Sequence, residues 1–196
     1  MAIVGSGPSV KKVDLSILRD RIHVIAINES WRLVPFADML YGCDAVWWSI
    51  RNGVPDFKGL KVSQDELACA KYPDIKRVKI LDPMSNTLIL NKPGEIGAGG
   101  NSGFQALNLA VQFGATGIML IGFDLHINDG DHWHGRHPQP LSNPDGFNIL
   151  RWVSAFERTT GLLKSMDVQV VNCSQYSKLT TYPKMTVEEA MRRWQL

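Results

Sequence analysis

The stretch Asn101–His137, NSGFQALNLAVQFGATGIMLIGFDLHINDGDHWHGRH, decides how the rest of the chain is interpreted. Phe104, Leu107 and Val111 stand at helical spacing, and Gly114 is the residue type that takes a left-handed conformation at a helix end. The unbroken apolar run 118–122 then predicts a strand covered on both faces, as in a parallel sheet. A helix followed by such a strand is typical of an α/β fold.

A dense polar loop follows this strand. Its polar residues are Asp124, His126, Asp129, Asp131, His132, His134, Arg136 and His137. In open α/β sheets, ligands bind just beyond the carboxyl ends of the strands. We therefore expect these side chains to border a ligand site.

The N-terminus predicts a second part of the same site. The apolar strand 2–4 runs directly into Gly5, Ser6, Gly7, Pro8 and Ser9. Glycines let the backbone approach an anion closely, and the N–H groups of such a turn can hold a phosphate. The third glycine of the dinucleotide fingerprint is missing, so an ordinary tight turn is the alternative.

The next strand, predicted at 23–27, ends at Asn28 and Glu29. A Rossmann-like site places its ribose contact at about this distance after the glycine turn. The other interpretation is that Asn28 caps the next element.

The remaining elements complete a single α/β domain. Strands are predicted at 37–43, 45–48, 60–62, 76–81 and 168–171, and helices at 14–18, 65–71, 147–163 and 187–194. Residues 82–100 hold prolines and glycines without periodicity and predict a long irregular connection. Trp47 and Trp48 would point to opposite faces of a strand, one into the core and one toward a base or sugar. The expected fold is one Rossmann-like domain, 1–196, with a mostly parallel sheet and helices on both faces.

Composition narrows the function classes. A chain of 196 residues, 44% hydrophobic, suits one core, and a net charge of +2 without a basic run gives no support for nucleic acid as a partner. Cys43, Cys69 and Cys173 are odd in number and lack CxxC spacing, so neither a disulfide framework nor a zinc ribbon is indicated, and a reducing cytoplasm is predicted. The strand pattern at residue 2 leaves no room for a signal peptide, and no membrane span is expected.

Four short motifs resemble a known family when they are taken in order. Gly5–Ser9, Asn28, Asn101–Gly103 and Gly122–Asp124 resemble the single-domain bacterial lipooligosaccharide sialyltransferases. They are also similar to the related motility accessory factor glycosyltransferases and archaeal hydroxymethylpterin diphosphokinases. The histidine-rich loop after Asp124 is closer to the motility accessory factor pattern. The resemblance implies transfer of a sugar from a nucleotide sugar of the CMP-sugar kind to an unknown acceptor, with no cofactor.

The resemblance also implies roles for individual residues. The implied nucleotide contacts are Gly5, Ser6, Gly7, Pro8, Ser9, Asn28, Glu29 and Ser49. The implied donor-sugar contacts are Asn101, Ser102, Gly103 and Asp124. The implied catalytic residues are His126 and His132 at the leaving phosphate, and His134 or His137 as general base. The sialyltransferases carry an arginine three residues before the serine, where this chain has Gly99, and this departure argues against sialic acid as donor.

Three alternative interpretations stay open, one for the histidine loop and two for the whole protein. Histidine titrates near neutrality and suits a general base, but the same imidazoles, with Asp129 and Asp131, also suit zinc or a related ion. A pterin diphosphokinase-like phosphotransferase would use Mg²⁺ and ATP, with Asp124, Asp129 and Asp131 as its candidate carboxylates. A nucleotide-binding or partner-binding module without turnover is the third. The sequence is also compatible with assembly of the protein into a homo-oligomer.

Overall fold

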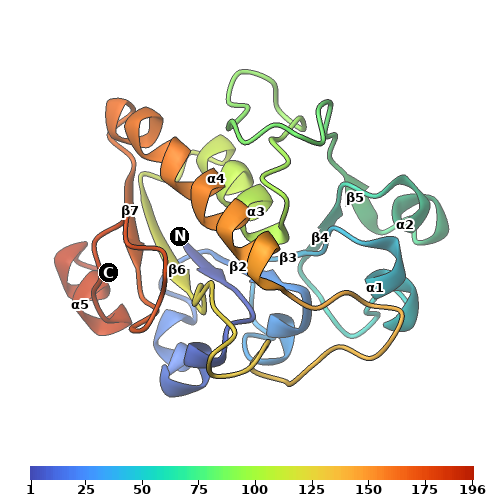
Figure 1. Cartoon of the computed structure of the whole chain (residues 1–196), viewed down its shortest axis with the longest axis horizontal. Coiled ribbons are helices and arrows are strands. Elements are labelled where there is room, and N and C mark those ends of the chain that lie inside the picture. Colours follow the sequence, from blue (N-terminus) through green and yellow to red (C-terminus); the bar gives the residue numbers. More distant parts are fainter.

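The computed structural model describes all 196 residues, and its centre is a seven-stranded sheet in which every strand pair is parallel (Figure 1). The strand order is β5-β4-β3-β2-β1-β6-β7. The strands are β1 (Ala2–Val4), β2 (Val24–Ile27), β3 (Met39–Tyr41), β4 (Leu60–Ser63), β5 (Ile75–Arg77), β6 (Gly117–Ile121) and β7 (Gln169–Asn172). The predicted α/β class with a parallel sheet is confirmed.

Helices cover both faces of this sheet. They are η1 (Pro8–Lys12), η2 (Leu15–Leu18), η3 (Asn28–Arg32), α1 (Ala45–Ile50), α2 (Glu66–Lys71), α3 (Ser102–Gln112), α4 (Gly146–Ser165) and α5 (Val187–Arg193). Successive strand residues point to opposite faces. Ile3 and Ile25 therefore pack with residues of α3 and α4, whereas Val4 and Ala26 pack with residues of η1, η2, α1 and α5. The ribbon of α4 crosses one face of the sheet beside α3 (Figure 1). None of these helices is long and apolar enough to cross a bilayer.

The prediction of a strand at 45–48 is wrong, because these residues form the helix α1. Neighbouring residues of a helix lie about 100° apart, so both tryptophans can enter the same core. Trp47 and Trp48 are buried and meet edge to face, with ring centroids 4.9 Å apart. Their indole N–H groups donate to Glu29 Oε1 at 3.1 Å and to Gly42 O at 3.0 Å.

The predicted strand at 76–81 is shorter and begins earlier than expected, as β5. Lys79 leaves the sheet and pairs with Glu95 in an isolated bridge. The long connection at 82–100 is irregular, as predicted, and a buried amide of α3 holds it: Asn108 Oδ1 accepts from Ile89 N–H at 2.8 Å and Gly97 N–H at 3.0 Å. This segment is therefore tied to the domain at defined points.

The chain changes direction across the sheet between β1 and β6. From β1 it proceeds through β2, β3 and β4 to the edge strand β5, and it returns to the other side of β1 with β6. A crevice opens at such a switch point, outside the carboxyl ends of the two central strands. The glycine turn follows β1, and the histidine-rich loop follows β6.

Candidate active site

The glycine turn and the segment after β6 touch one another at this switch point. Gly5 N–H donates to Ile121 O at 2.7 Å, and Gly7 N–H donates to Gly122 O at 2.8 Å. A Cβ atom on Gly5 would lie 2.8 Å from Gly122 O, and one on Gly7 would lie 2.6 Å from Asp124 Cγ. The glycines are therefore needed for the close approach of the two segments. The predicted meeting of these distant parts of the chain is confirmed.

Asp124 fastens the two segments together. Ser9 N–H donates to Asp124 Oδ2 at 2.8 Å, and the Ser9 hydroxyl donates to Asp124 Oδ1. The histidine-rich loop is also joined to the glycine turn, by a backbone hydrogen bond that Trp133 N–H donates to Ser6 O at 2.8 Å. Asp124 borders the cavity, but both of its oxygens are already hydrogen-bonded within the protein.

The turn offers few free donors to a phosphate. The N–H groups of Gly5, Gly7 and Ser9 donate to protein acceptors, and Pro8 has none. Ser6 keeps both its N–H group and its hydroxyl without a protein partner, and the hydroxyl oxygen is buried. Binding at this turn therefore depends on Ser6 more than on a ring of amides.

A cavity of about 350 Å³ opens between these segments and α4. Its walls include Gly5, Ser6, Gly7, Asn28, Cys43, Asp44, Trp47, Gly100, Asn101, Ser102, Gly103, Asp124, His126, Asp131, His132, His137, Asn143, Asn148, Ile149 and Trp152. Asn28 turns the chain at the end of β2 with φ +47°, a conformation that asparagine tolerates better than most residues. Its Oδ1 is buried without a partner. The volume is within the range of small-molecule sites.

The first turn of α3 forms another wall. The Asn101 side chain caps the helix by accepting from Phe104 N–H at 2.9 Å. The N–H groups of Ser102 and Gly103 have no protein acceptor, and a Cβ on Gly103 would lie 2.7 Å from the Phe123 ring. Free N–H groups and the positive end of the helix dipole favour an anion at this position.

His126, His132 and His137 reach the cavity wall, whereas His134 lies outside it. His126 is buried, and its Nδ1 lies 3.3 Å from Asn128 N, from which it accepts a hydrogen bond. Burial lowers the pKa of His132 to about 3 and that of His134 to about 4, and the neighbouring imidazoles add to both shifts. The pKa of His137 is lowered for the same main reason, burial. Neutral imidazoles therefore prevail in this loop at neutral pH.

Four of the predicted nucleotide contacts are not brought to the cavity wall. Pro8 and Ser9 lie in η1. Glu29 is buried, and its carboxylate accepts from Arg32, Arg51 and Trp47. Ser49 is exposed on α1. Among the acidic residues, Asp129 is exposed and Asp131 pairs with Arg136, with Arg136 Nε 3.1 Å from Asp131 Oδ2.

Sequence reasoning missed several wall residues. Cys43 and Asp44 follow β3, whose carboxyl end lies at the same sheet edge, so their position was a usable signal. Burial raises the pKa of the Cys43 thiol, which favours its neutral form. Trp152 of α4 donates from Nε1 to Gly100 O at 2.8 Å and closes the opposite wall with Asn148. No local pattern marks these two, because their place depends on how α4 packs on the sheet.

Comparison with known proteins adds evidence on the fold. No known family model matches the sequence, and no curated protein matches it. Among solved structures, the Campylobacter jejuni sialyltransferase CstII in complex with cytidine-5′-monophosphate aligns over 94% of this chain and 84% of its own, with a TM-score of 0.59 and 14% identity. The chain shares the CstII fold.

Two further CstII structures agree. The complex with a trisaccharide acceptor and CMP aligns over 94% of this chain and 85% of its own, with a TM-score of 0.56 and 12% identity. Monomeric CstII aligns over 99% and 98% of the two chains, with a TM-score of 0.56 and 12% identity. The resemblance to sialyltransferases that the sequence motifs indicate is thus confirmed at the level of fold.

Proposed function

We propose that this protein is a glycosyltransferase that takes its donor as a CMP-sugar-like nucleotide sugar and uses a histidine as general base. The observation that carries the proposal is that the unpartnered Ser6 hydroxyl of the glycine turn and the unpartnered Asn28 Oδ1, just after β2, share one cavity with three imidazoles. CstII, whose fold the chain shares, has been solved with CMP.

The nucleotide phosphate fits the wall formed by Ser6 and the start of α3. Ser6 supplies a free N–H and a buried hydroxyl, and Ser102 and Gly103 supply free helix N–H groups. These groups also stabilise the negative charge that develops on the phosphate as it leaves. Asn28, with its unpartnered Oδ1, is the proposed contact to the nucleoside.

The transfer step uses the imidazoles on the cavity wall. The acceptor hydroxyl oxygen forms a bond to the anomeric carbon of the sugar, and the bond from that carbon to the phosphate oxygen breaks. The acceptor proton passes to His137, which lines the cavity, in preference to His134, which does not. His126 and His132 donate N–H hydrogen bonds to the departing phosphate. The proposed step requires no metal.

The diphosphokinase alternative has weaker support in the geometry. It needs carboxylates that converge on Mg²⁺, yet Asp124 is held by Ser9, Asp131 pairs with Arg136, and Asp129 is exposed. These three side chains do not form a cluster suited to Mg²⁺.

Thermal-shift measurements with cytidine, uridine, guanosine and adenosine nucleotides, with and without Mg²⁺, test the proposal. A ligand that binds only the native state raises the melting temperature, and CMP is expected to do so without Mg²⁺. Stabilisation by ATP with Mg²⁺ alone would favour the diphosphokinase. Chromatography then measures the release of CMP from CMP-sugars in the presence of candidate acceptors. A protein that binds CMP but releases none from a CMP-sugar with any acceptor tested would be the non-catalytic module.

A further inference from the structure

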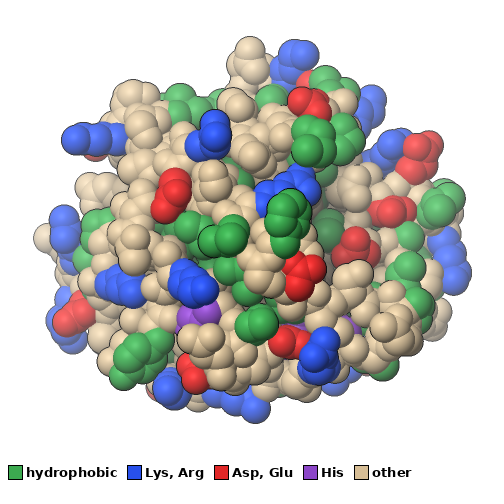
Figure 2. Space-filling view, in the orientation of Figure 1, with side chains coloured by type: hydrophobic (Ala, Val, Ile, Leu, Met, Phe, Trp, Pro, Cys, Tyr) green, Lys and Arg blue, Asp and Glu red, His purple; other side chains and the backbone are tan.

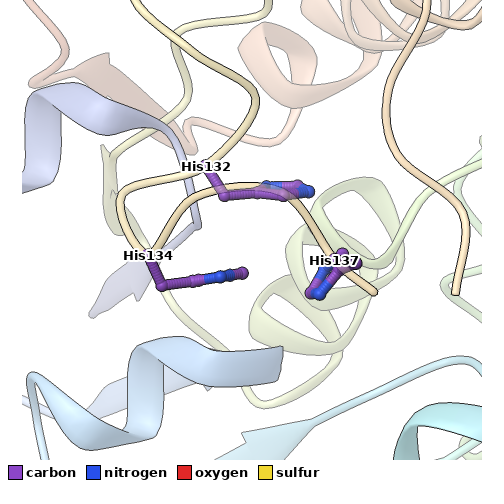
Figure 3. Close-up of side chains that lie close together, drawn as sticks. All are labelled: His132, His134 and His137. Atoms are coloured by element: carbon purple, nitrogen blue, oxygen red, sulfur yellow. The ribbon is translucent and has the colours of Figure 1, made fainter. Parts of the chain in front are cut away.

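Three histidine side chains gather at one point of the loop that follows β6. His132, His134 and His137 are close in sequence, and the rings of His132 and His134 are stacked, with His137 at their open side (Figure 3). Ring centroids are 5.0 Å apart for His132 and His134, 4.5 Å for His132 and His137, and 4.8 Å for His134 and His137. One ring nitrogen from each residue lies within 4.8 Å of the others.

Two of these nitrogens lack any partner in the protein. Nε2 of His132 and Nε2 of His134 are shut off from solvent and form no hydrogen bond. A buried polar atom without a partner costs free energy, so such atoms usually meet a ligand, an ion or water. Trp133 packs edge to face against His134, with centroids 5.3 Å apart, and restrains the orientation of that ring. Two of the three imidazoles therefore each have a buried nitrogen that no protein group uses.

We propose that His132, His134 and His137 form a binding site for one divalent transition-metal ion of the zinc type. Imidazole nitrogen is a preferred ligand of zinc, copper and nickel, whereas magnesium and calcium prefer oxygen. No thiol or carboxylate belongs to the cluster.

The geometry needs only a small adjustment to hold an ion. Two nitrogens bound to one tetrahedral zinc lie about 3.3 Å apart, because each is ~2.0–2.1 Å from the metal. The widest separation must therefore close from at most 4.8 Å to that spacing. Gly135 lies between the ligands at φ +89°, and a Cβ there would meet nothing within 4 Å, so the loop has room to tighten. Three protein ligands leave a fourth position open, as in zinc sites that bind a small molecule.

The site has a consequence for the proposed glycosyl transfer, which is a separate proposal. His137 and His132 also border the cavity, so an ion bound to them occupies the lone pair that a general base uses. Metal binding then switches the base off.

Charged side chains near the cluster act on the imidazoles through their electrostatic field. They are Glu29, Arg32, Arg51, Asp44 and Asp131, and none of them is a member of the cluster.

Titration of the chelator-treated protein with CoCl₂, followed by visible absorption, tests metal binding without any nucleotide. A tetrahedral Co²⁺ site gives visible bands, which are expected to saturate at one equivalent and to disappear when ZnCl₂ is added. His132→Ala and His137→Ala should each weaken binding by about tenfold or more. His23→Ala, which changes an exposed histidine outside the cluster, should bind as the unchanged protein does.

Thermal unfolding of each variant without metal shows whether it folds, and the zinc-induced rise in melting temperature gives a second readout. This rise should be smaller in the folded cluster variants than in the unchanged protein, and undiminished in His23→Ala. Equal Co²⁺ affinity in the triple variant His132→Ala, His134→Ala, His137→Ala would place the ion elsewhere, for instance at a cysteine, and overturn the proposal. Absence of saturable binding by the unchanged protein would overturn it as well.

Discussion

Ser9 and Asp124 hold the two halves of the site together, although 115 positions separate them in the sequence. The Ser9 N–H and hydroxyl both donate to the Asp124 carboxylate, which is 3% exposed. Since the carboxylate is buried and both donors come from η1, this contact adds to the backbone hydrogen bonds that set the position of the glycine turn relative to the histidine loop. Asp124 is thus a positioning residue.

Replacement of Asp124 by Ala is expected to lower the free energy of unfolding by about 1–3 kcal/mol, because Ser9 N–H is left without an acceptor. Urea unfolding measures the loss. Asp14→Ala is the matched control, because Asp14 Oδ1 accepts from Ser16 N–H at 3.0 Å and from the Ser16 hydroxyl at 2.6 Å, but on the surface. A smaller loss is expected there. Equal losses in the two variants would show that Asp124 does not tie the segments together.

Gly7→Ala should damage the site directly. Its Cβ would lie 2.6 Å from Asp124 Cγ and 2.7 Å from Gly122 O, so the two segments must separate, at a cost of about 1–3 kcal/mol. Gly161→Ala is the control, because a Cβ in that turn of α4 meets nothing within 4 Å and should stabilise the helix by about 0.5–1 kcal/mol. Thermal unfolding compares both variants with the unchanged protein. A Gly7→Ala variant that melts normally would contradict the packing described for the turn.

Much of this arrangement could be predicted from the sequence because parallel topology constrains it. An apolar strand before Gly5 and another before Gly122 must end at the same sheet edge, so their loops meet without any knowledge of side-chain packing. The pattern of charged residues in the sequence adds little to the prediction of the site. Figure 2 shows acidic and basic side chains interspersed over the face that carries α4, without a patch of one sign. The meeting of the two loops therefore follows from the strand patterns together with a parallel sheet, whereas the strand order is known only from the structure.

Other features depend on packing that local patterns do not encode. The aromatic and β-branched residues at 45–48 favour a strand, but burial of Trp47 and Trp48 on one side of the sheet selects a helix. Glu29 follows β2 as a ribose contact would, yet Arg32 and Arg51 on its own side of the fold take its carboxylate. Trp152 enters the site only through the docking of α4.

Stability should fall at acid pH through the pair Lys61 and Asp74. The buried Lys61 Nζ donates to Asp74 Oδ2 at 2.7 Å, and this hydrogen bond lowers the pKa of Asp74 below its ordinary value of 3.8. Because the folded pKa is depressed, the contribution is present above pH 3.8 and is lost as the pH falls through the folded value. Asp74→Asn should lower the free energy of unfolding by on the order of 0.5–1 kcal/mol at pH 7. This value is small because Asp74 is exposed and solvent weakens its interaction with Lys61.

Urea unfolding from pH 7 to pH 3 measures this effect. The difference in the free energy of unfolding between the unchanged protein and Asp74→Asn should shrink below pH 3.8. Glu66→Gln removes an exposed ion pair with Arg77 and serves as the control, with little change expected at any pH. A difference that stays constant down to pH 3 would exclude titration of Asp74 as its cause.

His137→Ala should reduce the rate of glycosyl transfer by about 10²- to 10⁴-fold, because the acceptor proton loses its base. Nucleotide affinity should stay unchanged, since His137 is assigned to the acceptor and not to the nucleotide. CMP release in the presence of a chelator measures the rate, and calorimetry measures the affinity. His134→Ala should lose less, because His134 lies off the cavity wall, and His23→Ala should be unaffected. Full turnover in His137→Ala would remove it as the base.

Asn28→Gly isolates the nucleoside contact from the shape of the backbone. Asn28 and Asn52 have φ values of +47° and +49°, which glycine adopts without strain, so either substitution removes an amide side chain and leaves the turn intact. Because Asn28 Oδ1 has no partner in the protein, its loss should leave the free energy of unfolding nearly unchanged. CMP affinity should fall about tenfold, the equivalent of one hydrogen bond of about 1.4 kcal/mol, whereas Asn52→Gly should bind CMP normally. Isothermal titration with CMP compares the two, and equal affinities would mean that the Asn28 amide faces no nucleotide.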